Sequence, residues 1–351
     1  GDLSRRPAGA YLGAEAVAIC FLHAHVNPIH EDRVAGIAQE AGFSHISVSS
    51  RVSRLEGFVP RCDTTVVDAY LSKVIREYVA SLQSSMPEAR IQLMTSNGGL
   101  VSADSAGGKD TILSGPAGGV VGCQKIARTA GYPKTIGFDM GGTSTDVTRI
   151  DGPLEYQFET VKAGVCIMTP MLAIETVAAG GGSICSFDGQ RLLVGPESAG
   201  ADPGPACYGR GGPLTLTDVN VFLGRLPPTR FPFSLDREIV QVKFQHFSDD
   251  IYTATGQTLD LHELAEGWID IANSQMAAAI KSVSLAKGHD PREYTLMSFG
   301  GAGGLHACGI ARRLGIQRII ASPLAGVLSA VGIEAASAKR MAQRSVRLTL
   351  N

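Results

Sequence analysis

The sequence has few aromatic residues, little net charge and no long apolar run. Only 6% of its 351 residues are aromatic, and the formal net charge is −2. This near balance excludes the basic excess that is typical of nucleic-acid-binding proteins. The longest apolar runs, such as Val17–Leu22, are far too short to span a bilayer. We therefore expect neither a nucleic acid nor a membrane as a partner.

The cysteines give no sign of a disulfide framework or of a zinc site. Seven are scattered singly along the chain, and no Cys-x-x-Cys pair occurs. An odd number of isolated cysteines fits reduced thiols. Together with the lack of a signal-peptide pattern, this predicts a cytoplasmic protein. Hydrophobic residues make up 44% of the chain, which is enough for a buried core, and the length predicts two domains.

Glycine is the residue that is abundant. The chain has 42 glycines, and many are clustered, at 98–99, 118–119, 141–142, 180–182, 211–212 and 300–304. Clustered glycines between apolar segments mark places where the backbone approaches a ligand or another backbone closely. Ordinary turns are the alternative for any single pair, but the number of clusters favours ligand-binding loops.

The hydrophobic pattern predicts an α/β fold. Strands over 17–22, 46–49 and 91–94 alternate with helices over 28–42 and 64–84, an order typical of a mostly parallel sheet with crossover helices. A glycine-rich helix over about 116–130 is interpreted as the link between two domains. Strands over 135–139 and 145–150 then form a hairpin. An irregular insertion over about 152–260 precedes a long helix (263–288) and further α/β elements (294–338).

The strongest motif is the hairpin turn that contains Asp139, Gly141, Gly142, Thr143, Ser144, Thr145 and Asp146. A glycine pair allows a tight turn whose N–H groups face inward, which makes an anion-binding concavity. The three hydroxyls can donate to phosphate oxygens, and Asp139, with Asp146, is a candidate ligand of a hydrated Mg²⁺ ion. No Gly-Lys-Ser/Thr is present, and a strand follows rather than a helix, so this is not a Walker loop. The alternative is a plain hairpin turn with a polar tip.

A second glycine-rich turn joins a predicted strand to a predicted helix at Phe299–Ala307. It contains Gly300, Gly301, Gly303 and Gly304, followed by His306. A helix N-terminus attracts anions, and glycines let a ring or ribose lie against the backbone. His306 is either a catalytic base or, as we favour, a histidine with a structural hydrogen bond.

Three segments resemble parts of actin-like ATPases. In chain order, the small-residue helix at Ser114–Gly122 resembles the connecting helix, the hairpin turn resembles the second phosphate loop, and the turn at Phe299–Ala307 resembles the adenosine loop. The segments LSGPAGGVVG (113–122), FDMGGTSTDV (138–147), GPESAGADPGPACYG (195–209) and LTDVNVFLGRL (216–226) resemble the hydantoinase A/5-oxoprolinase family. The resemblance runs from about residue 15 to about residue 340. One difference is Gly304, where the family usually has proline.

The resemblance implies two ribonuclease-H-like domains with ATP between them: the last part of the first domain over 1–115, and the second domain over 116–351. It implies an ATP-dependent enzyme that opens a lactam or imide after phosphorylation of its carbonyl oxygen, with Mg²⁺ and a hydantoinase B-type partner subunit or domain. Because the family places a further Gly-Gly-Thr phosphate loop upstream, we expect this chain to be a central fragment that is inactive alone.

The resemblance also implies further site residues. The glycine-rich segment with Gly181, Gly182 and Ser183 is expected to hold a phosphate or an oxyanion through its backbone N–H groups. Asp218 is, like Asp139, a candidate catalytic residue. The alternative role for Asp218 is a helix or turn cap. Two other functions stay open: a subunit of an ATP-dependent ketone carboxylase, and a non-enzymatic actin-like regulator that binds nucleotide.

Overall fold

A computed structural model describes residues 14–162, 164–227, 229, 231–343 and 345. These residues form two compact units, each built from stretches that are not contiguous in sequence. The first unit combines the described residues up to Val121 with 155–172 and those from Ile333 onward. The second unit combines 122–154 with 173–332. The sequence, by contrast, predicts a single division between residues 115 and 116.

The first unit begins with a parallel strand pair and its crossover helix. β1 (Ala16–Ile19) pairs with β2 (His45–Val48), and α1 (Ile29–Glu40) connects them. β1 is shorter than the predicted strand over 17–22 because a turn starts after Cys20 and leaves Phe21 and Leu22 exposed.

A long helix, α3 (Phe58–Ser85), packs on this pair. The unit also holds α2 (Ser49–Val52), β3 (Gln92–Met94), β4 (Leu100–Ser102), β7 (Tyr156–Gln157), β8 (Thr160–Lys162), β9 (Val165–Ile167) and β10 (Met171–Leu172). The glycine-rich helix α4 (Ser114–Thr129) contains the passage from the first unit to the second.

A mixed five-stranded sheet forms the base of the second unit, with the order β11-β6-β5-β14-β15. β5 (Lys134–Met140) and β6 (Thr145–Asp151) form the predicted hairpin. β14 (Thr295–Phe299) runs parallel to β5 and to β15 (Ile319–Ala321), and β11 (Glu175–Val177) runs antiparallel to β6. The chain therefore has a mixed α/β fold, as the pattern predicts.

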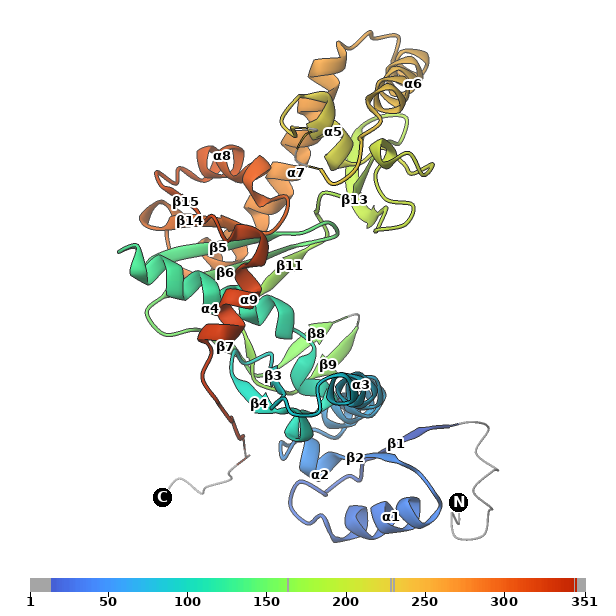
Figure 1. The fold of residues 1–351 in the computed structure, drawn as a ribbon, viewed down its shortest axis with the longest axis vertical. Coiled ribbons are helices and arrows are strands. Elements are labelled where there is room, and N and C mark those ends of the chain that lie inside the picture. Colours follow the sequence, from blue (N-terminus) through green and yellow to red (C-terminus); the bar gives the residue numbers. More distant parts are fainter. Residues whose placement is uncertain (1–13, 163, 228, 230, 344, 346–351) are drawn as a thin grey trace. The chain divides into compact units, whose positions relative to one another are not determined.

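Helices α7 and α8 cover this sheet (Figure 1). α7 (Leu261–Val283) buries a stripe of apolar residues that includes Leu264, Trp268 and Ala272. On its other side α7 contacts β13 (Leu192–Ser198), which pairs with β12 (Ser183–Phe187). The remaining helices of this unit are α5 (Leu216–Phe222), α6 (Arg237–Thr255), α8 (Gly303–Leu314) and most of α9 (Leu328–Ala335).

Helix α6 corrects the expectation that residues 152–260 are irregular. It starts at Asp236, whose carboxylate accepts a hydrogen bond from the Ile239 N–H, and it ends at Gly256 in the left-handed conformation. Its buried stripe includes Val240 and Phe244, and Phe244 stacks on Phe222 of α5. The helix exists because this stripe packs on α5 and α7.

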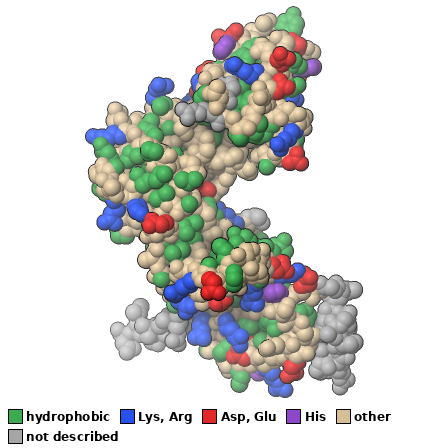
Figure 2. Space-filling view, viewed as in Figure 1, with side chains coloured by type: hydrophobic (Ala, Val, Ile, Leu, Met, Phe, Trp, Pro, Cys, Tyr) green, Lys and Arg blue, Asp and Glu red, His purple; other side chains and the backbone are tan. Residues whose placement is uncertain are grey.

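The exposed face of the molecule has no single charge sign. Figure 2 shows Lys and Arg side chains interspersed with Asp and Glu side chains over the face in view. Among the described residues, no helix has both the length and the apolar character that crossing a membrane requires.

Candidate functional site

The centre of the candidate site is the turn of the β5–β6 hairpin. Asp139 and Asp146 are direct partners across the two strands, and Phe299 at the end of β14 is the partner of Asp139 on the other side. The turn is closed by the Gly141 N–H, which donates to the Ser144 carbonyl oxygen at 3.0 Å. The hairpin register therefore brings both predicted carboxylates to the same end of the sheet.

The tip of this turn has unused hydrogen-bonding groups. Gly142 and Thr143 are exposed, and within the described part of the chain their N–H groups donate to no other residue. A Cβ atom at Gly142 would meet no atom within 4 Å, and its φ is not positive. The protein's own structure thus gives no steric reason for glycine at this position, and there is room beside the backbone for another group to approach.

Thr145 differs from the other hydroxyl residues of the turn. It is fully buried, and its Oγ1 donates to the Ala179 carbonyl oxygen. Ser144 is half-buried and Thr143 is exposed. The hydroxyl of Thr145 therefore fixes the turn to the neighbouring segment.

The segment that contains Gly181, Gly182 and Ser183 supports the turn from one side. The Gly181 and Gly182 N–H groups donate to the carbonyl oxygens of Gly141 and Gly142, at 3.0 and 2.6 Å. The Ser183 Oγ accepts from the Gly180 N–H at 2.8 Å, and Ser183 is fully buried. These N–H groups are therefore engaged within the protein rather than turned toward a phosphate as expected, and the geometry gives the segment a supporting role.

Close backbone contact explains the glycine that opens this segment. A Cβ atom at Gly180 would lie 2.6 Å from the carbonyl carbon of Thr143, a distance that atoms of a folded protein do not adopt. Sequence reasoning missed Thr217, which also holds the segment: its N–H and Oγ1 both donate to the Gly181 carbonyl oxygen, at 2.7 and 2.8 Å. The one sequence signal for this contact is the place of Thr217 in the LTDVN motif, directly before Asp218.

The glycine-rich turn at Phe299–Ala307 joins β14 to α8 and lies against Asp139. Gly300 has a φ of +78°, and a Cβ atom there would collide with Asp139 Oδ1 and lie 2.5 Å from the Met140 carbonyl oxygen. The Ala302 N–H donates to the same Met140 oxygen at 3.0 Å. Gly301 and Gly304 face open space, and Gly303 is buried at the start of α8. The fold thus brings the three predicted glycine-rich segments together around Asp139.

Electrostatics single out Asp139 among the acidic residues of the site. Burial, together with the negative charge of Asp146, raises the pKa of the Asp139 carboxyl to about 6. The Asp146 Oδ1 accepts a hydrogen bond from Thr176 Oγ1 at 2.7 Å. No group of three or more His, Cys, Asp or Glu side chains that could hold a metal occurs among the described residues. A metal ion here would keep most of its ligands as water or phosphate oxygens.

Asp218 lies in different surroundings. It is fully buried, and its carboxylate accepts from the N–H groups of Ala206, Cys207 and Thr215, at 3.0, 2.7 and 2.8 Å, and from Thr215 Oγ1 at 2.9 Å. It forms the capping box of α5 with Thr215. The carboxylate is fully occupied, so the geometry favours the cap rather than the catalytic role that the sequence suggested.

His306 is a buried, neutral histidine in the first turn of α8. Its Nδ1 lies 2.9 Å from Asn273 Oδ1 on α7, and its Nε2 has no hydrogen-bond partner among the described residues. Burial, with a smaller contribution from the positive charge of Arg225, lowers the pKa of His306 to about 4. Its contact with α7 fits the structural role that we favoured.

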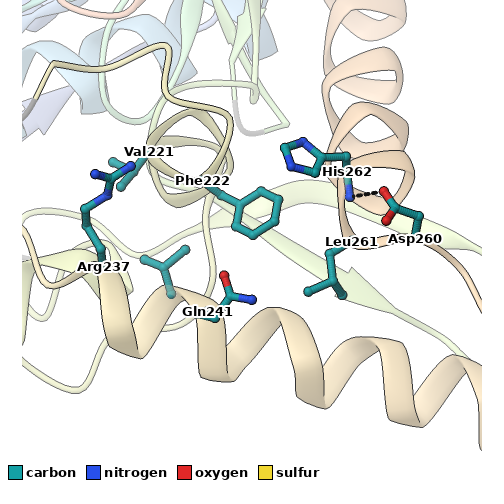
Figure 3. Close-up of a pocket in the computed structure, with 8 residues that line it drawn as sticks. Val221, Phe222, Arg237, Gln241, Asp260, Leu261 and His262 are labelled. Carbon is teal, nitrogen blue, oxygen red and sulfur yellow. Dashed lines mark hydrogen bonds between the residues drawn. The ribbon is translucent and has the colours of Figure 1, made fainter.

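A separate cavity of about 490 Å³ lies between α5, α6 and α7. Figure 3 shows the Phe222 ring between the side chains of Gln241 and His262, with Arg237 at one side. The hydrogen bond drawn there joins the His262 N–H to Asp260 and caps α7. None of the predicted site residues lines this cavity.

Comparisons with a family model and with curated proteins point to the same protein family. The model of the hydantoinase/oxoprolinase family matches residues 61–342. The 5-oxoprolinase of Saccharomyces cerevisiae is 47% identical over 338 residues, which cover 92% of this chain and 26% of that protein. The chain thus spans about a quarter of the length of this curated relative.

Two solved structures resemble the chain over most of its length. The nucleotide-free structure of an acetone carboxylase matches with a TM-score of 0.80 and 28% identity, covering 93% of this chain and 47% of that one. The ATP-dependent caprolactamase of Pseudomonas jessenii matches with a TM-score of 0.77 and 31% identity, covering 92% of this chain and 48% of that one.

Proposed function

Because the chain belongs to the hydantoinase/oxoprolinase family, we propose that it provides nucleotide-binding machinery for the ATP-dependent hydrolysis of a cyclic amide. The observation that carries the proposal is the convergence of three glycine-rich segments on Asp139, with the exposed N–H groups of Gly142 and Thr143 at the tip. The printed names of relatives, 5-oxoprolinase and ATP-dependent caprolactamase, support the class of substrate.

We assign the polyphosphate to the turn tip, where the hydroxyls of Thr143 and Ser144 and the backbone N–H groups of Gly142 and Thr143 would meet it. The adenosine is assigned to the turn of β14 and α8, where Gly301 and Gly304 face open space. Both assignments follow from unused N–H groups and from room beside the backbone. We also infer that the fold contains two ribonuclease-H-like domains.

Asp139 and Asp146 fit a hydrated Mg²⁺ ion. Burial and, to a smaller extent, the negative charge of Asp146 raise the pKa of Asp139, and a divalent cation would favour the charged form of both carboxylates. When bound, the ion would neutralise phosphate charge. Asp139 would orient its water ligands, and the Thr176 hydroxyl would hold Asp146 in place.

The chemistry explains why a nucleotide is needed. Resonance makes the carbonyl carbon of a lactam or imide a poor electrophile. Transfer of the terminal phosphoryl group of ATP to the carbonyl oxygen gives ADP and an activated ring. Addition of one water molecule then breaks the ring C–N bond and leaves an acyl phosphate, which a second water molecule hydrolyses to the carboxylate and inorganic phosphate. Preorganised N–H groups at the turn, and a cation held by Asp139 and Asp146, would stabilise the phosphoryl transfer.

A partner subunit or domain completes the proposal. The name of a relative that is 35% identical, caprolactamase subunit alpha from Pseudomonas jessenii, indicates that this relative works with other subunits. We propose that the hydrolytic step in the present protein also requires a hydantoinase B-type subunit or domain.

A ketone carboxylase is the second candidate, because of the match to acetone carboxylase. The experiment measures ATP hydrolysis by the protein together with the proposed partner subunit or domain, in the presence of a cyclic amide, of a ketone plus bicarbonate, and of neither. We expect stimulation by the cyclic amide and its loss in Asp139→Ala. Stimulation by the ketone mixture alone would favour the carboxylase, and turnover that responds to neither would contradict both enzymes and favour a nucleotide-binding regulator.

A further inference from the structure

The first compact unit contains a cavity of about 350 Å³ in which none of the assigned nucleotide-binding residues takes part. Its walls come from four segments of this unit: Arg51–Arg54 at the end of α2, Lys109, Met168–Pro170 and residues 341–343. Segments that are far apart in the sequence thus meet around one small volume.

The charged side chains of this cavity are all positive. Arg51, Arg54 and Lys109 line it, and no Asp or Glu is among the described residues that do so. Arg51 pairs with Asp32 outside the cavity, where both side chains are largely exposed, and such a pair exchanges readily for another anion. Lys109 Nζ lies 2.5 Å from Asp110 Oδ1.

Arg54 differs from Arg51 and Lys109 because it forms no ion pair with any described residue. Among the described residues its guanidinium makes one hydrogen bond, from Nε to the Ser50 carbonyl oxygen at 3.2 Å. A guanidinium has five N–H donors in a planar fork that matches a carboxylate. The Nη groups of Arg54 are therefore available to a ligand at the cavity.

A buried hydroxyl on the same wall lacks a partner. Ser53 lines the cavity and is only 7% exposed, and its Oγ forms no hydrogen bond with any described residue. An unpaired buried hydroxyl costs free energy, and such groups in folded proteins are usually satisfied by a partner or a ligand. An acceptor oxygen in the cavity would satisfy Ser53.

The rest of the wall is mostly apolar, with Val52, Met168, Pro170, Met341 and Ala342 beside the polar Thr169 and Gln343. A site with positive charge and an unpaired hydroxyl on a mostly apolar wall suits a small organic acid. We propose that this cavity binds the carboxylate of a small cyclic molecule through Arg54, Lys109 and Ser53, with the ring of the ligand against Met168 and Pro170.

This inference deepens the proposed function and rests on it for the identity of the ligand: the substrate would be a cyclic amide that carries a carboxylate. Two probes separate the carboxylate from the ring. 5-Oxoproline is a five-membered lactam with a carboxylate, and 2-pyrrolidinone is the same ring without it. Charge-assisted hydrogen bonds from an arginine to the carboxylate would discriminate between them.

The test is calorimetric titration of the full chain with each probe in the absence of nucleotide. We expect 5-oxoproline to bind at least about ten-fold more tightly than 2-pyrrolidinone. Arg54→Glu should abolish the preference, and Ser53→Ala should weaken binding of 5-oxoproline by about three- to ten-fold. Arg90→Glu, an equal charge change at an exposed position of the same unit, is the matched control and should change nothing.

Equal affinity for the two probes, or no binding of 5-oxoproline to the folded wild-type chain, would overturn the inference. An equal loss of 5-oxoproline affinity in Arg54→Glu and Arg90→Glu would also overturn it, because it would mean that only the overall charge of the chain matters. Separate titration with Mg-ATP distinguishes the two proposals. Nucleotide binding without recognition of the carboxylate removes this inference alone, whereas recognition of the carboxylate without nucleotide binding removes the proposed function and leaves the anion site.

Discussion

The glycines of the candidate site fall into two groups, according to whether the protein leaves room for a side chain at each position. Gly142 and Gly301 have room for a side chain, so their small size matters only when a ligand is present. Gly180 and Gly300 have no such room, because another backbone or carboxylate occupies the position of a Cβ atom. Substitutions at Gly142 and Gly301 are therefore expected to affect ligand binding. Substitutions at Gly180 and Gly300 are expected to affect stability.

A matched pair of variants tests this difference. Gly300→Ala combines a left-handed φ with a collision at Asp139 and Met140, and we expect it to lower the free energy of unfolding by about 3 kcal/mol. Gly301→Ala should stay within about 0.5 kcal/mol of the wild type. Urea unfolding of the three proteins measures both values. Similar stability for the two variants would mean that the turn does not lie against Asp139.

His306 predicts a pH dependence of stability. Its pKa of about 4 in the folded chain lies below the ordinary value of 6.5, so between these values the unfolded chain binds a proton that the folded chain does not. Its contribution to stability is complete above pH 6.5 and is lost as the pH falls toward 4.

We expect His306→Gln to reduce the slope of the unfolding free energy against pH in this window by up to about 1.4 kcal/mol per pH unit. Urea unfolding at several pH values between 4.5 and 7 (a range set by the roughly two-unit window) gives the slopes. The same slope in both proteins would contradict a buried neutral imidazole.

At the scale of elements, the predictable parts were those with a strong local pattern. The β5–β6 hairpin and the buried stripe of α7 were both evident from the alternation and spacing of apolar residues. Helix α6 was missed because turn-forming residues around it hid its stripe. The three glycine-rich segments were recognised, but their convergence on Asp139 depends on β14 pairing with β5, which no local pattern encodes.

The roles of Asp218 and of the 180–183 segment could not be predicted for a related reason. Both resemble ligand-binding elements in the sequence. A carboxylate or N–H group that is free to bind a ligand has the same sequence pattern as one that is hydrogen-bonded within the protein. Their partners, such as Cys207 for Asp218 and Gly141 for Gly181, are distant in sequence. Only tertiary structure distinguishes a group that holds a loop from one that holds a substrate.

Helix α5 provides a test of the role of Asp218. Asp218→Asn keeps the shape but turns an N–H₂ group toward N–H donors, so we expect a loss of about 3 kcal/mol in the free energy of unfolding. Asp236→Asn, at the exposed N-cap of α6, should cost only a few tenths of a kcal/mol because asparagine is an equally good cap. Unchanged stability of Asp218→Asn would reopen the catalytic interpretation.

At the scale of the whole molecule, the two compact units have different proposed tasks. The second unit would hold the nucleotide around Asp139, and the first would recognise the carboxylate of the substrate through Arg54. Because each set of residues lies within one unit, the two binding events can be measured independently on the same chain. A variant in one site is expected to leave ligand binding at the other site measurable.

The central claim is that the turn around Asp139 binds the phosphates of ATP. Calorimetric titration of Mg-ATP into the wild-type chain, Asp139→Ala and the exposed control Asp270→Ala tests it most directly, with thermal unfolding to confirm that each variant is folded. We predict binding by the wild type and the control, and affinity at least about ten-fold weaker for Asp139→Ala. Equal affinity in all three proteins, or no binding by the folded wild-type chain, would contradict the account.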